Sequence, residues 1–195
     1  MLCDCNLRSG LFNVSVVPFI AMADVIKIAT VRGSLTDPVD LAIRLFSFLK
    51  EGVHTEIWWG DYRFFSAGWC NGVGVLQESD GYDAADWDVV EVPVSDIDVA
   101  LGFVDAALES SVPYGVNPVE CALHYCRDDL DCCRPDTWDR VFCSQFALLF
   151  LRWCAVHGVL VCEDAKPLWS VNSRGCLPCR LTHILGEMGL HEGKV

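Results

Sequence analysis

Two segments far apart in the chain carry residues that could perform nucleophilic chemistry. Residues 53–60 read as a strand in which His54 and Glu56 are two positions apart, so both side chains project from one face. In residues 141–148, Cys143 precedes a strongly apolar run typical of a helix. A thiol, an imidazole and a carboxylate are the groups of cysteine-based acyl chemistry. The pattern predicts Cys143 as the nucleophile, His54 as its base and Glu56 as the orienting carboxylate.

The position of Cys143 in its helix affects its reactivity. The apolar run continues to residue 153, and His157-Gly158 is a usual C-terminal signal. The start of the helix is open. Start signals at residues 135–137 would place Cys143 about two turns into the helix, whereas a later start would place it in the first turn. In the first turn, the positive helix end lowers a thiol pKa, and backbone N–H groups near Cys143 and Ser144 are available to bind an oxyanion.

The histidine strand precedes the cysteine helix, which is the reverse of the order in papain-type enzymes. In this order and in its motifs the chain resembles the circularly permuted papain-like hydrolases of the NlpC superfamily, which include YiiX-like proteins and lecithin retinol acyltransferases. The histidine motif of the YiiX-like branch, H-x-E-I, matches residues 54–57, and its aromatic-Cys-Ser motif matches residues 142–144. Many relatives have glutamate where this chain has Gln145. The resemblance spans about residues 25–185.

The resemblance implies an α+β fold, with a small antiparallel sheet packed against helices. It implies a cysteine hydrolase of the amidase or peptidase type, which acts through a thioester on a peptide, a cell-wall peptide or a lipid-like substrate. No cofactor is expected. Trp58, on the face of His54 and Glu56, could line an apolar substrate groove. Tyr114, in a Pro-Tyr-Gly loop placed as in the family, and Ser144 are further candidate substrate-binding residues.

Composition favours one compact domain. The chain has 195 residues, of which 52% are hydrophobic and 21% charged, which suffices for a substantial core. We expect an N-terminal arm over residues 1–22, without a requirement for fixed structure, and a single papain-like domain over residues 23–195. The apolar run in the arm is too short and too interrupted to span a bilayer. We therefore expect no transmembrane segment.

The charge balance excludes some partners. The formal net charge is −13, with 14 Lys and Arg against 27 Asp and Glu. Nucleic-acid binding depends on clustered Lys and Arg, so we expect no nucleic-acid partner. The acidity also disfavours anionic lipid headgroups and leaves room for an uncharged or cationic substrate. The sequence does not specify an oligomeric state.

The 12 cysteines have two readings. A chain of this length can build its core without disulfides, and no convincing signal peptide precedes it. We therefore expect free thiols and a cytoplasmic or intracellular location, including the host cytoplasm if the source is a virus or phage.

Metal binding is the rival reading for these thiols. His124, Cys126, Cys132 and Cys133 are close in sequence, and Cys176 and Cys179 form a two-residue-spaced pair. A structural zinc site usually has two such pairs, and adjacent cysteines suggest poor ligand geometry, so no metal site is expected. A zinc-stabilised interaction domain stays as an alternative.

Hydrophobic periodicity and turn residues predict the remaining elements. Besides the histidine strand, we expect strands over residues 25–31, 62–69, 72–77 and 89–94, helices over residues 38–50 and 96–108, a cysteine-rich connector over residues 120–138, and a short final helix within residues 168–185.

Each site residue taken alone has a structural explanation, and only the joint pattern favours catalysis. Two other functions therefore stay open: an inactive papain-like binding or scaffolding module, and a lipid-directed acyltransferase or thioesterase.

Overall fold

The computed structural model describes residues 23–33, 52–67, 72–77, 87–115 and 129–190. This part of the chain contains a five-stranded antiparallel sheet and three α-helices, which confirms the predicted α+β class. The elements are β1 (Asp24–Val31), β2 (His54–Trp59), β3 (Tyr62–Ala67), β4 (Gly72–Gln77), β5 (Trp87–Val94), α2 (Ile97–Glu109), α4 (Cys143–Val156) and α5 (Pro178–Glu187), with 3₁₀ helices η3 (Pro135–Thr137), η4 (Lys166–Trp169) and η5 (Ser173–Gly175).

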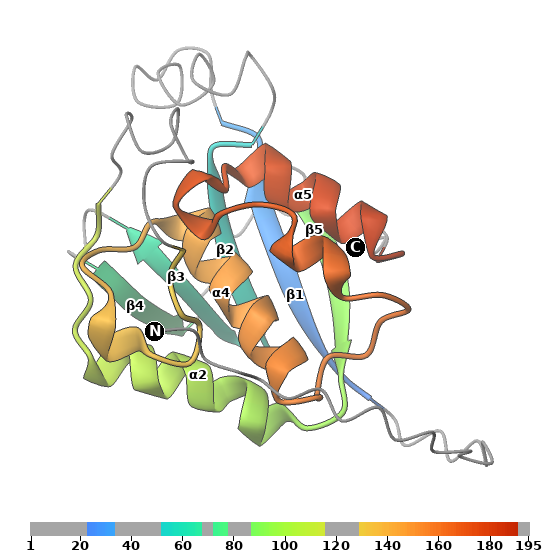
Figure 1. The fold of residues 1–195 in the computed structure, drawn as a ribbon, viewed down its shortest axis with the longest axis horizontal. Helices are drawn as coiled ribbons and strands as arrows, with labels where there is room; N and C mark the ends of the chain where they lie inside the picture. Colours follow the sequence, from blue (N-terminus) through green and yellow to red (C-terminus); the bar gives the residue numbers. More distant parts are fainter. Residues whose placement is uncertain (1–22, 34–51, 68–71, 78–86, 116–128, 191–195) are drawn as a thin grey trace.

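The sheet has the order β4-β3-β2-β1-β5, so the histidine strand β2 is central (Figure 1). All of the predicted strands are present. Residues 68 and 69 of the predicted third strand lie outside the described residues, and β5 is described from Trp87, two residues before its predicted start. The predicted helix over residues 38–50, the arm over residues 1–22 and part of the predicted connector lie outside the described residues.

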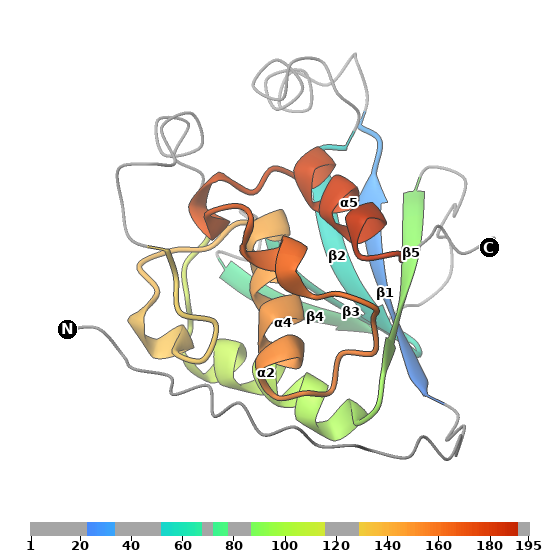
Figure 2. The same cartoon turned by 45° about the vertical axis from the view of Figure 1, so that its right-hand side comes forward.

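Helices α2 and α4 contact the sheet, and α5 packs against α4 (Figures 1 and 2). Ile57 of β2 is fully buried in the core beside the apolar side chains of α4. Because side chains alternate along a strand, Glu56 and Trp58 project from the opposite face, where Arg63 of β3 is in register with Trp58. The candidate base and its carboxylate therefore belong to the face that α4 does not cover.

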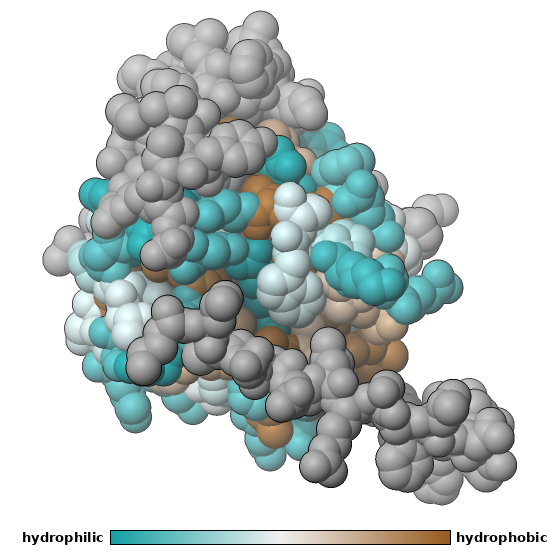
Figure 3. All heavy atoms as spheres, in the orientation of Figure 1, coloured by the Kyte–Doolittle hydropathy of each residue, from teal (hydrophilic) through white to brown (hydrophobic). Residues whose placement is uncertain are grey.

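The nucleophile helix α4 is buried on all sides. Its residues 143–152 and Cys154 are all buried, because the sheet covers one side and α2, α5 and the 3₁₀ segments cover the others. A helix that is apolar all round is stable only in such surroundings. Over α4 and α5 the surface visible in Figure 3 is mainly hydrophilic, with separate hydrophobic areas.

Helix α2 forms as predicted, but its buried face is rotated. Asp96 caps the helix by accepting a hydrogen bond from the Val99 N–H at 3.1 Å. The amphipathic pattern of the sequence predicts one buried stripe, of which Ala100 and Val104 are buried, whereas Ile97, Leu101 and Leu108 are only half-buried. The buried residues are Ala100, Phe103, Val104 and Ala107. The stripe turns toward Phe103 because this ring packs among aromatic side chains of α4.

None of the helices in the described ranges is long and apolar enough to cross a membrane.

The ring of Phe103 should be a main source of stability. It is fully buried and contacts the rings of Trp138, Phe146, Phe150 and Trp153 at centroid distances of 5.7, 5.3, 5.7 and 6.1 Å. We expect Phe103→Ala to lower the free energy of unfolding by about 3–5 kcal/mol, measured by urea denaturation. Val156→Ala, at a position that is 56% exposed, is the control and should change it by less than about 0.5 kcal/mol. Equal effects of the two changes would contradict this packing.

Candidate active site

The candidate nucleophile lies where two strands separate. β2 and β3 are in register from Ile57–Phe64 to Trp59–Tyr62, and the described parts of the two strands then diverge (Figure 1). The segment before α4 lies between them, because the Ser66 hydroxyl of β3 donates to the Val141 carbonyl at 2.9 Å. On the β2 side, the Thr55 backbone N–H donates to the Cys143 sulfur. The separation of the strands thus brings Cys143 to the level of His54.

Helix α4 begins at Cys143, so the later of the two predicted starts is correct. Phe142 precedes the helix with extended backbone angles, φ −116° and ψ 170°. Cys143 therefore occupies the first turn, where backbone N–H groups have no earlier helical partner and the helix dipole favours negative charge. Pro135–Thr137, read from the sequence as start signals, form the separate 3₁₀ helix η3.

Gln145 supports this helix start. Its side-chain oxygen accepts a hydrogen bond from the Phe142 backbone N–H at 3.3 Å, and only 2% of the residue is exposed. This contact satisfies one backbone donor at the helix N-terminus, as a third-position Gln or Glu commonly does. A neutral amide makes this bond without adding a negative charge that would oppose thiolate formation at Cys143.

Glu56 is a buried carboxylate with three side-chain partners. It is 5% exposed. Arg63 donates to both of its oxygens at 2.7 Å, and the Trp58 indole N–H donates at 2.8 Å. His54 Nε2 lies 3.3 Å from its Oε1. Burial alone would raise the pKa of Glu56, but the hydrogen bonds from His54, Arg63 and Trp58 lower it, so the carboxylate is ionised.

His54 and Cys143 form a hydrogen-bonded pair, and each changes the pKa of the other. Burial lowers the pKa of His54, but the charge and hydrogen bond of Cys143, followed by those of Glu56, outweigh it and raise the pKa to about 10. Burial raises the pKa of Cys143, but the charge and hydrogen bond of His54 and the N–H groups of Thr55 and Ser144 bring it below its usual value. The pair therefore favours a thiolate beside an imidazolium more than an isolated thiol would.

At other described cysteines no neighbouring group outweighs the effect of burial on the pKa. It raises the pKa of Cys132, Cys154 and Cys176 to about 12 and also raises that of Cys162. None of these four thiols has a histidine among the groups that affect its pKa. Within this set, Cys143 alone has a pKa below that of an ordinary thiol.

Aromatic rings surround the base. The Trp87 ring meets the His54 ring edge-on at 6.4 Å and lies 5.1 Å from the Trp58 ring. The Arg63 guanidinium lies 5.6 Å from the Trp87 ring centroid and 5.9 Å from that of Trp58. Trp58 thus uses its indole N–H to hold Glu56, while its half-buried ring is available to line an apolar groove.

Tyr114 lies on the nucleophile side of the site. Phe142 and Cys143 form a small buried cluster, against which the partly buried Tyr114 and Leu177 pack. The backbone holds Tyr114 there, because the Pro113 carbonyl accepts from the Val141 N–H at 3.0 Å. Its placement is compatible with the predicted contact to substrate.

Ser144 is differently placed. Its side chain is fully buried, and its hydroxyl donates to the Cys176 carbonyl at 2.6 Å. This bond attaches the first turn of α4 to the loop that leads into α5. Only the backbone N–H of Ser144 is oriented to the sulfur of Cys143, so any contact with substrate would come from that group.

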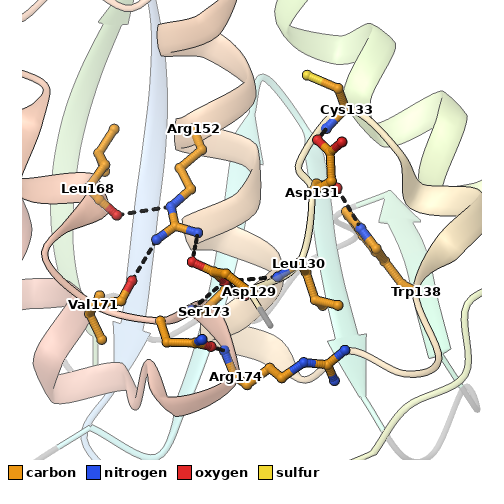
Figure 4. Close-up of polar contacts among 11 residues, drawn as sticks. Asp129, Leu130, Asp131, Cys133, Trp138, Arg152, Leu168, Val171, Ser173 and Arg174 are labelled. Carbon is orange, nitrogen blue, oxygen red and sulfur yellow. Dashed lines mark hydrogen bonds and ion pairs between the residues drawn. The ribbon is translucent and has the colours of Figure 1, made fainter. Parts of the chain in front are cut away.

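An ion-pair network farther along α4 fixes the same loop. Arg152, 2% exposed, donates to the carbonyl oxygens of Leu168 and Val171 and to the carboxylate of Asp129 (Figure 4). Asp129 also accepts two hydrogen bonds from Ser173, at 2.8 Å from its N–H and 2.5 Å from its hydroxyl. The network fastens the 3₁₀ segments before Cys176 to the nucleophile helix.

Sequence analysis identified Cys143, His54 and Glu56, and the structure brings all three together. It missed Arg63 and Trp87, whose side chains complete the surroundings of Glu56 and His54. The predicted strands over residues 53–60 and 62–69 are close enough in sequence to pair as a hairpin. Pairing them in this way would have placed Arg63 opposite Trp58. Trp87 lies in β5, far from His54 in the sequence, so no local pattern predicts that the two rings lie side by side.

No known protein family, curated protein or solved structure matches this chain.

The pKa changes of His54 and Cys143 predict the pH dependence of alkylation. Iodoacetamide should label Cys143 rapidly below about pH 7, where an ordinary thiol with a pKa near 8.5 is mostly protonated. In His54→Ala, burial should then dominate and raise the pKa of Cys143, so labelling should require a pH above that of an ordinary thiol. The labelled peptide is identified by mass spectrometry.

The control for this measurement is Cys162, a partly exposed thiol in the same protein. Its labelling should be slow below pH 7 and unaffected by His54→Ala. If Cys143 and Cys162 have the same pH profile in the unaltered protein, the paired thiolate does not form.

The guanidinium of Arg63 should be needed for stability because Glu56 is buried. Arg63→Met leaves that carboxylate without its bidentate partner, and we expect the free energy of unfolding to fall by about 3 kcal/mol. Removal of one partner of a buried ion pair usually costs about 3–5 kcal/mol, and the low end applies because the Arg63 side chain is 21% exposed. Glu56→Gln added to Arg63→Met should recover part of the loss, since it removes the unpaired charge.

Arg134→Met is the matched control, because Arg134 pairs with Asp136 on the surface, where both side chains are more than half exposed. It should leave the urea midpoint unchanged. If the double variant is as unstable as Arg63→Met alone, the loss does not come from an unpaired Glu56.

Proposed function

We propose that this protein is a cysteine hydrolase of the circularly permuted papain-like type, acting on an amide or ester bond through a thioester on Cys143. The observation that carries the proposal is the buried series Cys143–His54–Glu56, in which the thiol pKa is lowered while the imidazole pKa is raised. Burying a thiolate beside an imidazolium costs free energy, and this arrangement is the one that nucleophilic cysteine chemistry requires. The order of the histidine strand and cysteine helix supports the permuted arrangement.

In the proposed reaction, the thiolate of Cys143 attacks the carbonyl carbon of the substrate, and the carbonyl electrons move to oxygen. Backbone N–H groups in the first turn of α4 are positioned to stabilise that oxyanion. As the intermediate collapses, the imidazolium of His54 gives its proton to the leaving amine or alcohol, and the acyl group stays on sulfur as a thioester.

Deacylation reverses these roles. Neutral His54 takes a proton from water, the resulting hydroxide attacks the thioester, and the acid leaves as Cys143 recovers its electron pair. Glu56 accepts from His54 in both steps and stabilises the imidazolium, while Arg63 and Trp58 keep the carboxylate in place. The next acceptor need not be water, so an amine or alcohol would convert hydrolysis into acyl transfer.

The walls of the site favour an acyl donor with an apolar part. Tyr114 and Leu177 pack beside Cys143, and the ring of Trp58 is half-buried near His54. These side chains suit an aliphatic or aromatic acyl chain, which is compatible with a hydrophobic peptide or a lipid ester. The same observation favours the lipid-directed acyltransferase or thioesterase as the second candidate.

An acyl-enzyme trapping experiment tests the proposal. The full-length protein is incubated with p-nitrophenyl esters of increasing chain length and with apolar peptide amides, quenched in acid and examined by intact-protein mass spectrometry. We expect one acyl group per chain, released by hydroxylamine and located on Cys143. Cys143→Ala should form no adduct, and Cys162→Ala, at a thiol outside the site, should match the unaltered protein.

Addition of a primary amine to the same reaction separates hydrolysis from transfer, because an acyltransferase would yield the amide as its main product. Absence of any adduct on Cys143, together with ordinary alkylation behaviour of this thiol, would reject the enzyme and favour a binding or scaffolding module.

A further inference from the structure

A second cluster of reactive groups lies in the loop before η3. Asp131, Cys132 and Cys133 each offer a ligand atom, and these atoms lie within 4.8 Å of one another. The two sulfur atoms are 3.9 Å apart. No step of the proposed reaction uses this loop, and the cluster is therefore independent of the candidate active site.

The sulfur separation fits a metal ion. In tetrahedral zinc sites each sulfur lies about 2.3 Å from the metal, which places two sulfurs roughly 3.8 Å apart. The observed 3.9 Å is close to this value. The expectation from sequence that adjacent cysteines give poor ligand geometry is wrong here, because the turn directs both sulfurs to the same side.

Hydrogen bonds fix that turn. The Asp131 carboxylate accepts from the Cys133 N–H at 2.9 Å, and the Asp131 carbonyl accepts from the Trp138 indole at 2.8 Å (Figure 4). The same carbonyl accepts from the Arg134 N–H at 3.1 Å. A loop that is already held in shape loses little conformational entropy when it binds an ion.

The charges near the cluster suit a soft cation. Two thiolates and a carboxylate would bring three negative charges, and Arg152, whose charge acts on Cys132, offsets part of them. Thiolate ligands select Zn²⁺ or Cd²⁺ over Mg²⁺ and Ca²⁺.

We propose that Asp131, Cys132 and Cys133 bind one soft divalent cation of the Zn²⁺ type, with water completing a tetrahedral site. Binding replaces the two thiol protons, which pass to solvent, and involves no change of oxidation state. The ion would tie the turn to one shape two residues from Asp129, which holds Arg152 of the nucleophile helix. It would act as a local structural clamp.

Cobalt titration of the reduced, full-length protein tests the site, since Co²⁺ reports tetrahedral thiolate coordination by its visible and charge-transfer bands. We expect one equivalent to bind, to be displaced by Zn²⁺, and to bind more weakly as the pH falls, because protons compete with the ion for the thiolates. Cys133→Ser should lose the bands. Asp131→Asn keeps an acceptor for the Cys133 N–H and should weaken binding without abolishing it.

Two controls separate this site from other thiols. Cys162→Ser should bind Co²⁺ as the unaltered protein does, and so should Cys143→Ser, which tests the candidate catalytic pair. Unchanged bands in Cys133→Ser, or bands lost in Cys143→Ser, would overturn the proposal. Because Cys133 is exposed, its substitution should leave the unfolding midpoint in place.

Alkylation protection gives a second measurement that needs no variant. Zn²⁺ should protect the exposed Cys133 from iodoacetamide, as located by peptide mass spectrometry, and should leave Cys162 reactive. Unchanged labelling of Cys133 in the presence of Zn²⁺ would also overturn the proposal.

Discussion

The ion pair between Glu56 and Arg63 is the constraint on which the site depends. A carboxylate that is 5% exposed is costly unless its oxygens are hydrogen-bonded, and here three side chains supply those bonds. The ionised Glu56 in turn supports a charged His54, and the charged His54 supports a thiolate at Cys143. Each charge in this series is stabilised by the preceding one. The pair also fixes the pairing of β2 with β3 on the face away from α4.

The geometry of the candidate site also depends on the separation of β2 from β3. His54 belongs to the face opposite the helices, and a helix packed over a continuous sheet would not reach it. Because the two strands diverge, the segment before α4 enters between them, where Ser66 binds its backbone. Cys143 and His54 therefore meet at the level of the sheet.

Local patterns were sufficient to predict the parts of the site that depend on one element. Strand alternation placed His54 and Glu56 on one face, and the glycine after His157 marked the end of α4. The start of α4 could not be chosen from sequence, since it depends on Ser66 and Thr55, which are distant in the chain. The central role of Phe103 also depends on packing against α4, which the amphipathic pattern of α2 alone does not specify. Arg63 and Trp87 were missed because their roles arise from strand pairing.

The buried Arg152 makes the packing of α4 depend on segments that are synthesised after this helix. Its guanidinium is accommodated in an otherwise apolar helix because carbonyl groups of Leu168 and Val171 accept its hydrogen bonds. Those carbonyls, and the Cys176 carbonyl that receives Ser144, follow α4 in the chain. A nascent chain that has reached only Val156 contains Asp129 but lacks these carbonyls, so most hydrogen bonds of the Arg152 guanidinium are still missing and its burial is costly. The packing of the first turn of α4 around Cys143 can therefore be completed only after the segment through Cys176 has been synthesised.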